Sequence, residues 1–178
     1  MTDYCDIAPG DPLHGPYHDR EYGFPSRDEA VLFERLILEI NQAGLSWLTI
    51  LKRQQAFREA FRGFEIERVA RMSARDVERL MQDASIIRNR MKIEATIENA
   101  KRIRAIQREM GSFGDWLAAN HPRTKPDWVK LFKKTFVFTG GEIVGEFLMS
   151  TGYLPGAHRE SCPVYRRVAK LSPPWMAR

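Results

Sequence analysis

Helical periodicity extends through most of the chain between its two ends, and this feature constrains the fold more than any other. In the first clear helix, apolar residues recur at the spacing of one helical face: Leu32, Phe33, Leu36, Ile37 and Ile40. Ser26, followed three residues later by Glu29, has the pattern of a capping box and predicts the start of this helix. Gly44 predicts its end.

The same pattern of start and stop signals continues to residue 150. Ser46 predicts a helix that reaches about Phe61, Ser73 with Asp76 predicts another, and Asp127 predicts a third. The remaining expected helices cover residues 66–72, 88–110, 113–119 and 142–150. Only residues 136–138 resemble a strand, so the sequence predicts an all-α fold with irregular segments at 1–25 and 152–178.

Length and composition narrow the class of protein further. The 178 residues, 43% of them hydrophobic, are enough to bury the core of one domain and argue against disorder. No run of 18 apolar residues occurs and the N-terminus lacks a signal-peptide pattern, so we expect a cytoplasmic protein without a membrane partner. The formal net charge of +5 is compatible with a nucleic-acid partner, although it is weak evidence alone.

Four residues of metal-ligand type lie in the two end segments. Cys5 and His18 precede the first helix, whereas His158 and Cys162 follow the last one with the spacing H-x3-C. Thiolate and imidazole ligands suit tetrahedral zinc, and a closed site with four protein ligands would be structural. Neither pair is a zinc finger by itself, so from spacing alone two isolated thiols and two surface histidines remain an alternative.

Glu39 is a carboxylate on an apolar helical stripe. It follows Leu32 and Leu36 at helical spacing, so we expect its side chain to be buried. A buried carboxylate costs several kcal/mol unless it is paired, and either a structural partner or a ligand could neutralise it. Tyr17 and Trp47 are aromatic candidates to stack on a planar ligand, and a place in the core is the alternative for Trp47.

The segment from Asp127 to Ser150 predicts two helices joined by a turn at residues 135–141. Thr139, Gly140 and Gly141 lead directly into the second helix, whose free N–H groups could bind a phosphate. Lys134 adds positive charge beside the turn. An ordinary helical connection is the alternative interpretation.

Taken together, these motifs resemble those of the DNA-3-methyladenine glycosylase I family of helix-hairpin-helix glycosylases. The resemblance is carried by DPL (11–13), YHDREYG (17–23), Glu39 with QAGLSW (42–47), IIRNR (86–90) followed by Lys92, and the C-terminal His158-x3-Cys162. It covers nearly the whole chain. The sequence departs from the family pattern at His14, Tyr22 and Asn41, where Tyr, Trp and often Gln are usual.

The resemblance implies a function and a role for each candidate residue. It implies one structural zinc ion held by Cys5, His18, His158 and Cys162. It further implies a base pocket formed by Glu39, Tyr17 and Trp47, with His14 at its border. Residues 127–150 would be the helix-hairpin-helix that binds DNA, with contacts from Lys134, Thr139, Gly140 and Gly141, and Leu45 would fill the gap left by a flipped base.

On this basis we expect a monomeric enzyme that flips 3-methyladenine out of alkylated double-stranded DNA and hydrolyses its glycosidic bond without cutting the strand. Glu39 is the expected catalytic residue. One alternative is a non-enzymatic module that binds alkylated DNA on the same scaffold. Another is a zinc hydrolase with a different substrate, which four protein ligands on the metal would argue against.

Overall fold

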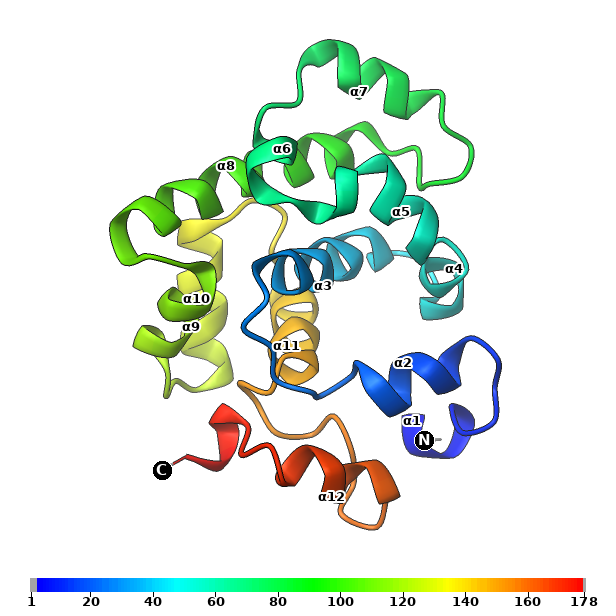
Figure 1. Ribbon diagram of the computed structural model, residues 1–178, viewed down its shortest axis with the longest axis vertical. Helices are drawn as coiled ribbons and strands as arrows, with labels where there is room; N and C mark the ends of the chain where they lie inside the picture. Colours follow the sequence, from blue (N-terminus) through cyan, green and yellow to red (C-terminus); the bar gives the residue numbers. More distant parts are fainter. Residues whose placement is uncertain (1–2, 178) are drawn as a thin grey trace.

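The computed structural model describes residues 3–177, and within this range every regular element is a helix, which confirms the all-α class (Figure 1). The elements are α1 (Tyr4–Ile7), α2 (His14–Arg20), α3 (Glu29–Gln42), α4 (Trp47–Leu51), α5 (Gln54–Ala60), η1 (Arg62–Phe64), α6 (Ile66–Ala70), α7 (Ala74–Met81), α8 (Arg90–Met110), α9 (Phe113–Asn120), α10 (Lys125–Thr135), α11 (Gly141–Ser150), α12 (Pro163–Ala169) and η2 (Pro174–Met176). None of these described helices is long and apolar enough to cross a membrane.

Helix α3 lies at the centre of the molecule and is surrounded by other helices (Figure 1). Its apolar stripe is buried as expected, and burial extends around the helix to polar residues, Glu39 among them. Helices α11, α8 and α9 pack against it. A central helix with few exposed positions can hold a polar side chain rigidly, because close packing leaves its neighbours little room to move.

Helix α3 begins later than its sequence predicted. Asp28, not Ser26, is the N-cap, and its side chain accepts hydrogen bonds from the backbone at the start of α3. The Ser26 hydroxyl instead accepts from the Asp28 amide. The Glu29 carboxylate accepts from the amides of Phe113 and Gly114 at 2.6 and 3.0 Å, so it caps α9 rather than its own helix.

The helix predicted to start at Asp127 begins at Lys125, with Thr124 as its N-cap. The Thr124 hydroxyl accepts from the Asp127 amide, and Pro126 sits in the first turn, where its missing N–H leaves no intrahelical bond unmade. The start signals at Ser46 and at Ser73 with Asp76 are confirmed, since both serines are N-caps. The helix that begins after Ser46 does not reach Phe61 without a break, however: α4 ends at Leu51, and α5 covers Gln54–Ala60.

The two ends of the chain are more ordered than expected. Short helices α1 and α2 lie within the segment predicted to be irregular, and α12 lies within the other (Figure 1). The two ends meet in a small cluster of buried side chains, separate from the main core: Cys5, Cys162, Val164 and Val168.

The turn between α10 and α11 is held by α8. The side-chain amide of Asn99 donates to the Val137 carbonyl at 3.0 Å, and its oxygen accepts from the Val137 amide at 2.9 Å. Phe136 is buried beside Phe132. These contacts fix the orientation of the turn and therefore the position at which α11 begins.

Candidate functional site

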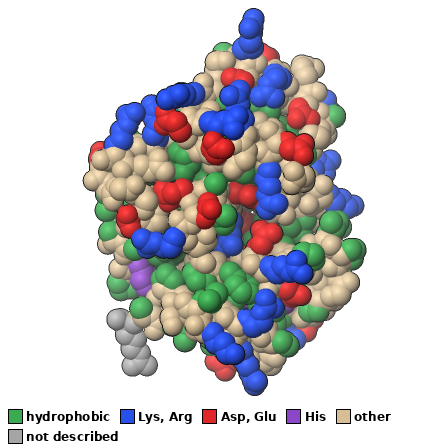
Figure 2. Space-filling view, viewed as in Figure 1, with side chains coloured by type: hydrophobic (Ala, Val, Ile, Leu, Met, Phe, Trp, Pro, Cys, Tyr) green, Lys and Arg blue, Asp and Glu red, His purple; other side chains and the backbone are tan. Residues whose placement is uncertain are grey.

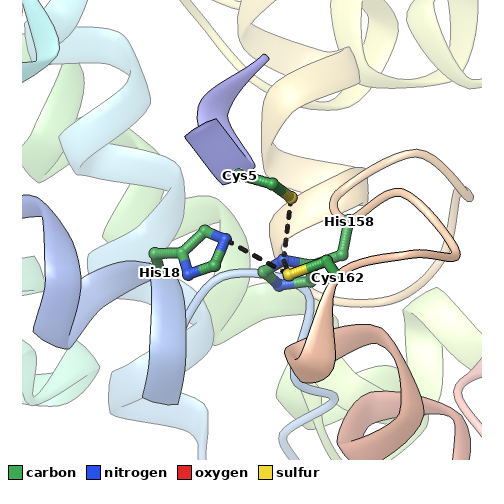
Figure 3. A group of neighbouring side chains, drawn as sticks. All are labelled: Cys5, His18, His158 and Cys162. Carbon is green, nitrogen blue, oxygen red and sulfur yellow. Dashed lines mark hydrogen bonds between the residues drawn. The ribbon is translucent and has the colours of Figure 1, made fainter. Parts of the chain in front are cut away.

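Cys5, His18, His158 and Cys162 form one buried cluster that joins the two ends of the chain (Figure 3). Their potential ligand atoms all lie within 4.8 Å of one another. The Sγ of Cys162 is 3.8 Å from Nε2 of His18, and the Sγ of Cys5 is 3.8 Å from Nδ1 of His158. Sulfur and nitrogen ligands of a tetrahedral zinc ion lie about 3.6 Å apart, given Zn–S and Zn–N lengths of about 2.3 and 2.0–2.1 Å.

Each histidine of the cluster donates a hydrogen bond outward from one ring nitrogen, which leaves its other ring nitrogen unprotonated and facing the cluster. Nδ1 of His18 donates to the Asp19 carboxylate at 2.7 Å, and Nε2 of His158 donates to the Tyr22 carbonyl at 2.6 Å. Such bonds orient metal-binding histidines and fix their tautomers. Burial raises the pKa of the Cys5 thiol to about 12, so a bound cation is needed to stabilise its thiolate at neutral pH. The donor set therefore fits a metal ion with four protein ligands.

A second feature is a cavity of about 860 Å³ between the N-terminal helices, α3, α4 and α11. Four aromatic side chains line it: Tyr4, Tyr17, Tyr22 and Trp47. Its carboxylates are Glu39, Glu142 and Glu146. The cavity thus combines aromatic walls with negative charge, a composition suited to a flat, electron-poor or cationic ligand.

Glu39 is buried in this cavity, with 4% of its surface exposed. Within residues 3–177 no side chain or backbone group donates a hydrogen bond to its carboxylate or forms an ion pair with it. Burial raises the pKa of Glu39 well above its ordinary value, and the negative charge of Glu146 raises it further. The structural partner that could have explained a buried carboxylate is therefore missing from the described chain, and the carboxylate is free to meet a ligand.

Tyr17 and Trp47 meet on one wall of the cavity. Their ring centroids are 5.1 Å apart, and Tyr17 also stacks on Tyr22 at 5.7 Å. Tyr17 is buried, whereas Trp47 stays half-buried at the start of α4, just after its N-cap Ser46. Trp47 is thus neither a pure core residue nor a surface residue.

His14 also lines the cavity, at the start of α2. Its Nδ1 lies 3.1 Å from the hydroxyl of Tyr4, within hydrogen-bonding distance. The residue is half-buried and does not project freely into solvent.

The turn after α3 carries Leu45 to the rim of the cavity, where 38% of the residue is exposed. Gly44 has a φ of 80°, in the left-handed region that glycine tolerates best. The ammonium of Lys92 fixes this turn, because it donates to the carbonyls of Asn41 and Ala43, each at 2.7 Å. Leu45 is therefore an exposed apolar side chain on a firmly held turn.

The residues predicted at the hairpin do not all reach the cavity. Gly140 and Gly141 line it, and a Cβ built on either would meet nothing within 4 Å. Neither has a positive φ, so the fold itself does not require glycine here, and the bare backbone leaves space for a ligand. Thr139 is buried, and Lys134 is exposed on the last turn of α10, outside the cavity lining.

Comparison with known proteins gives this arrangement a context. The family model described as methyladenine glycosylase matches residues 7–130. The DNA-3-methyladenine glycosylase of Haemophilus influenzae is 36% identical over 182 aligned residues, which cover 92% of this chain and 98% of that protein. The chain belongs to the DNA-3-methyladenine glycosylase I family. The Escherichia coli DNA-3-methyladenine glycosylase 1 is 45% identical over 119 residues, covering 66% of this chain and 64% of that protein.

Solved structures of this family have the same fold. A tyrosine-to-phenylalanine variant of 3-methyladenine DNA glycosylase I in complex with 3-methyladenine superposes with a TM-score of 0.82 at 35% identity, covering 92% of this chain and 97% of that one. The enzyme from Staphylococcus aureus gives 0.81 at 36% identity, with 90% and 95% covered.

Tyr4, Tyr22 and Glu146 are among the cavity residues that the sequence did not identify as site residues. Tyr4 comes from a helix that the sequence did not predict, and Tyr22 was noted as part of the motif YHDREYG (17–23) and as a departure from the usual Trp, without a role in the pocket. Glu146 reaches the cavity from α11, where the hydroxyl of Tyr22 donates to it at 3.1 Å. Helical spacing from Gly141 places Glu146 near the face of Glu142, but only the packing of α11 on α3 reveals its neighbours.

Proposed function

We propose that this chain is a DNA-3-methyladenine glycosylase that excises 3-methyladenine from alkylated double-stranded DNA. The observation that carries the proposal is Glu39, a buried and unpaired carboxylate inside an aromatic-walled cavity of a chain in this family. Its relatives are named for this activity, and one structure of the family holds the free base. The base must leave the duplex to enter such a cavity, and a damaged base unstacks at lower cost than a normal one.

The chemistry that this pocket would support is hydrolysis of a weakened bond. Adenine methylated at N3 in a nucleotide carries a positive charge, so the electrons of the C1′–N9 bond can leave with the base. Water then supplies the new oxygen on C1′ and releases a proton, and 3-methyladenine departs neutral. The cavity-lining residues, all in the described part of the chain, include no lysine to form a Schiff base, which favours hydrolysis without strand cleavage.

Tyr17 and Trp47 would hold the extruded base by stacking, worth roughly 1–3 kcal/mol per base, with His14 at the edge of the pocket. Glu39 would accept hydrogen bonds from the base and stabilise its positive charge, and we assign it the catalytic role. A neutral adenine gains less from this carboxylate, which is the basis of selection.

On the outer surface, Leu45 would occupy the space that the base leaves in the duplex. Gly140 and Gly141 would bring backbone N–H groups to a phosphate, with Thr139 supporting the turn and Lys134 contacting the backbone further along. Lys and Arg side chains are spread over the face shown in Figure 2 with Asp and Glu among them. The proposed DNA contact therefore rests on the turn at residues 139–141 and not on a continuous basic patch on this face.

We infer that the metal ion in the Cys5, His18, His158 and Cys162 cluster is zinc, one per chain. Two thiolates and two imidazoles are a preferred ligand set for structural zinc. Bound there, zinc would join the chain ends and supply no open position for catalysis. We further infer that residues 1–178 act as one monomeric glycosylase domain.

The test is to incubate the purified protein with methylated duplex DNA and to separate the released bases by chromatography. Release of 3-methyladenine, with alkali-sensitive abasic sites but no strand breaks before alkali, is the expected result. Tight binding of methylated DNA without base release would instead indicate the alternative, a non-enzymatic module.

A further inference from the structure

Tyr22 and Glu146 form a hydrogen-bonded pair inside the cavity that also holds Glu39. The hydroxyl of Tyr22 donates to Oε2 of Glu146 at 3.1 Å. The pair joins the N-terminal segment to α11, across 124 positions of sequence. The cavity therefore contains a second carboxylate with a fixed orientation, in addition to Glu39.

We propose that Glu146, oriented by Tyr22, is a second specificity-determining residue of the base pocket and selects cationic alkylated bases over neutral purines of the same shape. This inference rests on the proposed function, because it concerns how the same pocket chooses its substrate.

The orientation of Glu146 follows from how firmly Tyr22 is held. The Tyr22 ring stacks on Tyr17 at 5.7 Å and packs edge-on against Tyr4 at 5.6 Å. Its backbone carbonyl accepts a hydrogen bond from His158. A buried ring with contacts on several sides has few rotamers, so the Tyr22 hydroxyl is held at one position in the cavity. Its hydrogen bond fixes the Glu146 carboxylate beside it.

The electrostatics of the cavity explain why a positive charge would be preferred. Glu146 is half-buried, and burial raises its pKa, with repulsion from Glu142 adding to the effect. The Tyr22 hydroxyl and the ammonium of Lys125 oppose this rise. Glu146 in turn raises the pKa of Glu39, so the two negative charges disfavour each other in the empty cavity. A cationic base between them relieves the repulsion, whereas a neutral base leaves it in place.

Glu146→Gln tests this inference. The amide has nearly the same shape as the carboxylate and can still accept from Tyr22, so only the charge is removed. Two duplexes serve as probes: one with 3-methyladenine, and one with 3-deaza-3-methyladenine, a neutral isostere whose glycosidic bond is stable. The first reports single-turnover excision and the second reports binding.

We expect excision of 3-methyladenine to fall at least about fivefold in Glu146→Gln, while binding of the neutral duplex stays within about twofold. Tyr22→Phe keeps the ring and removes the hydroxyl, so it should shift the same ratio in the same direction by a smaller factor. Glu109→Gln removes the same charge from an exposed position near the end of α8, outside the cavity lining, and it measures the contribution of net charge to DNA binding. Its effect on the ratio should be clearly smaller.

Equal losses on both probes, or equal effects of Glu109→Gln and Glu146→Gln, would overturn the inference. So would unchanged excision by Glu146→Gln with normal zinc content and melting temperature. Each of these results presupposes an active wild-type protein. A wild-type protein that released no 3-methyladenine would refute the proposed function, so the two failures are distinguishable.

Discussion

Replacing Glu39 by Gln should stabilise the folded protein and at the same time impair excision. Glu39 is 4% exposed and has no hydrogen-bonding or ion-pairing partner among residues 3–177. The fold therefore keeps a carboxylate where burial disfavours its charge. Gln has nearly the same volume and no charge, so the substitution removes the electrostatic cost without leaving a cavity.

The dependence of this effect on pH has a definite sign. The pKa of Glu39 in the folded protein lies well above the value of about 4.3 for an unfolded chain. As pH rises past about 4.3, the unfolded state releases its proton first and is stabilised relative to the folded state. The stability of the wild type therefore falls, relative to Glu39→Gln, until the pH exceeds the folded-state pKa.

Each pH unit between the two pKa values of Glu39 corresponds to about 1.4 kcal/mol. The stability advantage of Glu39→Gln should therefore grow by up to about 1.4 kcal/mol for each pH unit within this interval. A gain of about 1.4 kcal/mol corresponds to an increase in melting temperature of roughly 3–6 °C for a chain of this size. The same variant should lose excision by at least about tenfold, or roughly 1.4 kcal/mol of transition-state stabilisation.

The assay combines urea unfolding at several values between pH 5 and pH 8 with single-turnover release of 3-methyladenine. Glu109→Gln, the same substitution at an exposed position near the end of α8, is the matched control and should show little change in either measurement. Wild-type excision rates in Glu39→Gln, or a stability difference that does not grow with pH, would refute the reasoning.

Three further predictions concern the metal, the DNA contact and the turn beside the pocket. The purified protein should contain one zinc per chain by elemental analysis, and Cys162→Ser should lose the metal and melt at a lower temperature. Elemental analysis that found no zinc in the freshly purified wild-type protein would contradict this prediction. Lys134→Ala should reduce the slope of log K against log salt by about one unit if the ammonium contacts a phosphate, and an unchanged slope would exclude that contact. Lys92→Met should leave the carbonyls of Asn41 and Ala43 without their hydrogen-bond donor. Excision from duplex DNA should therefore fall more than binding of free 3-methyladenine. Equal losses in the two measurements would mean that Lys92 supports the whole pocket.

The sequence predicted most reliably what local signals and chemistry determine. The capping box at Ser73 and the end of the helix expected over residues 88–110 depend on local signals, and both lie where expected, since α8 ends at Met110. The cluster of Cys5, His18, His158 and Cys162 was also predicted, but spacing alone left isolated thiols and surface histidines as an alternative, and the resemblance to the family decided between them.

The features that the sequence did not reveal depend on contacts between distant segments. Glu29 matches a capping box, yet its carboxylate binds the start of α9, 84 positions away, because α3 and α9 pack side by side. Likewise, Glu146 looks like an ordinary polar residue of α11 until Tyr22 is placed beside it. Side-chain partners of this kind depend on how helices pack and cannot be obtained from the periodicity of either helix alone.

The Cys/His cluster and the pocket share one short piece of backbone. His158, a member of the cluster, donates to the carbonyl of Tyr22, whose ring and hydroxyl line the cavity. The next residue, Gly23, has a φ of 85°, and a Cβ there would lie 2.8 Å from Cβ of Ala157 and 3.2 Å from the His158 ring. Only glycine allows the C-terminal segment to approach this closely. A metal ion bound in the cluster would fix His158 and, through it, the carbonyl of Tyr22. If Glu146, which accepts from the Tyr22 hydroxyl, selects the base as we propose, such an ion would affect base selection without contacting the base.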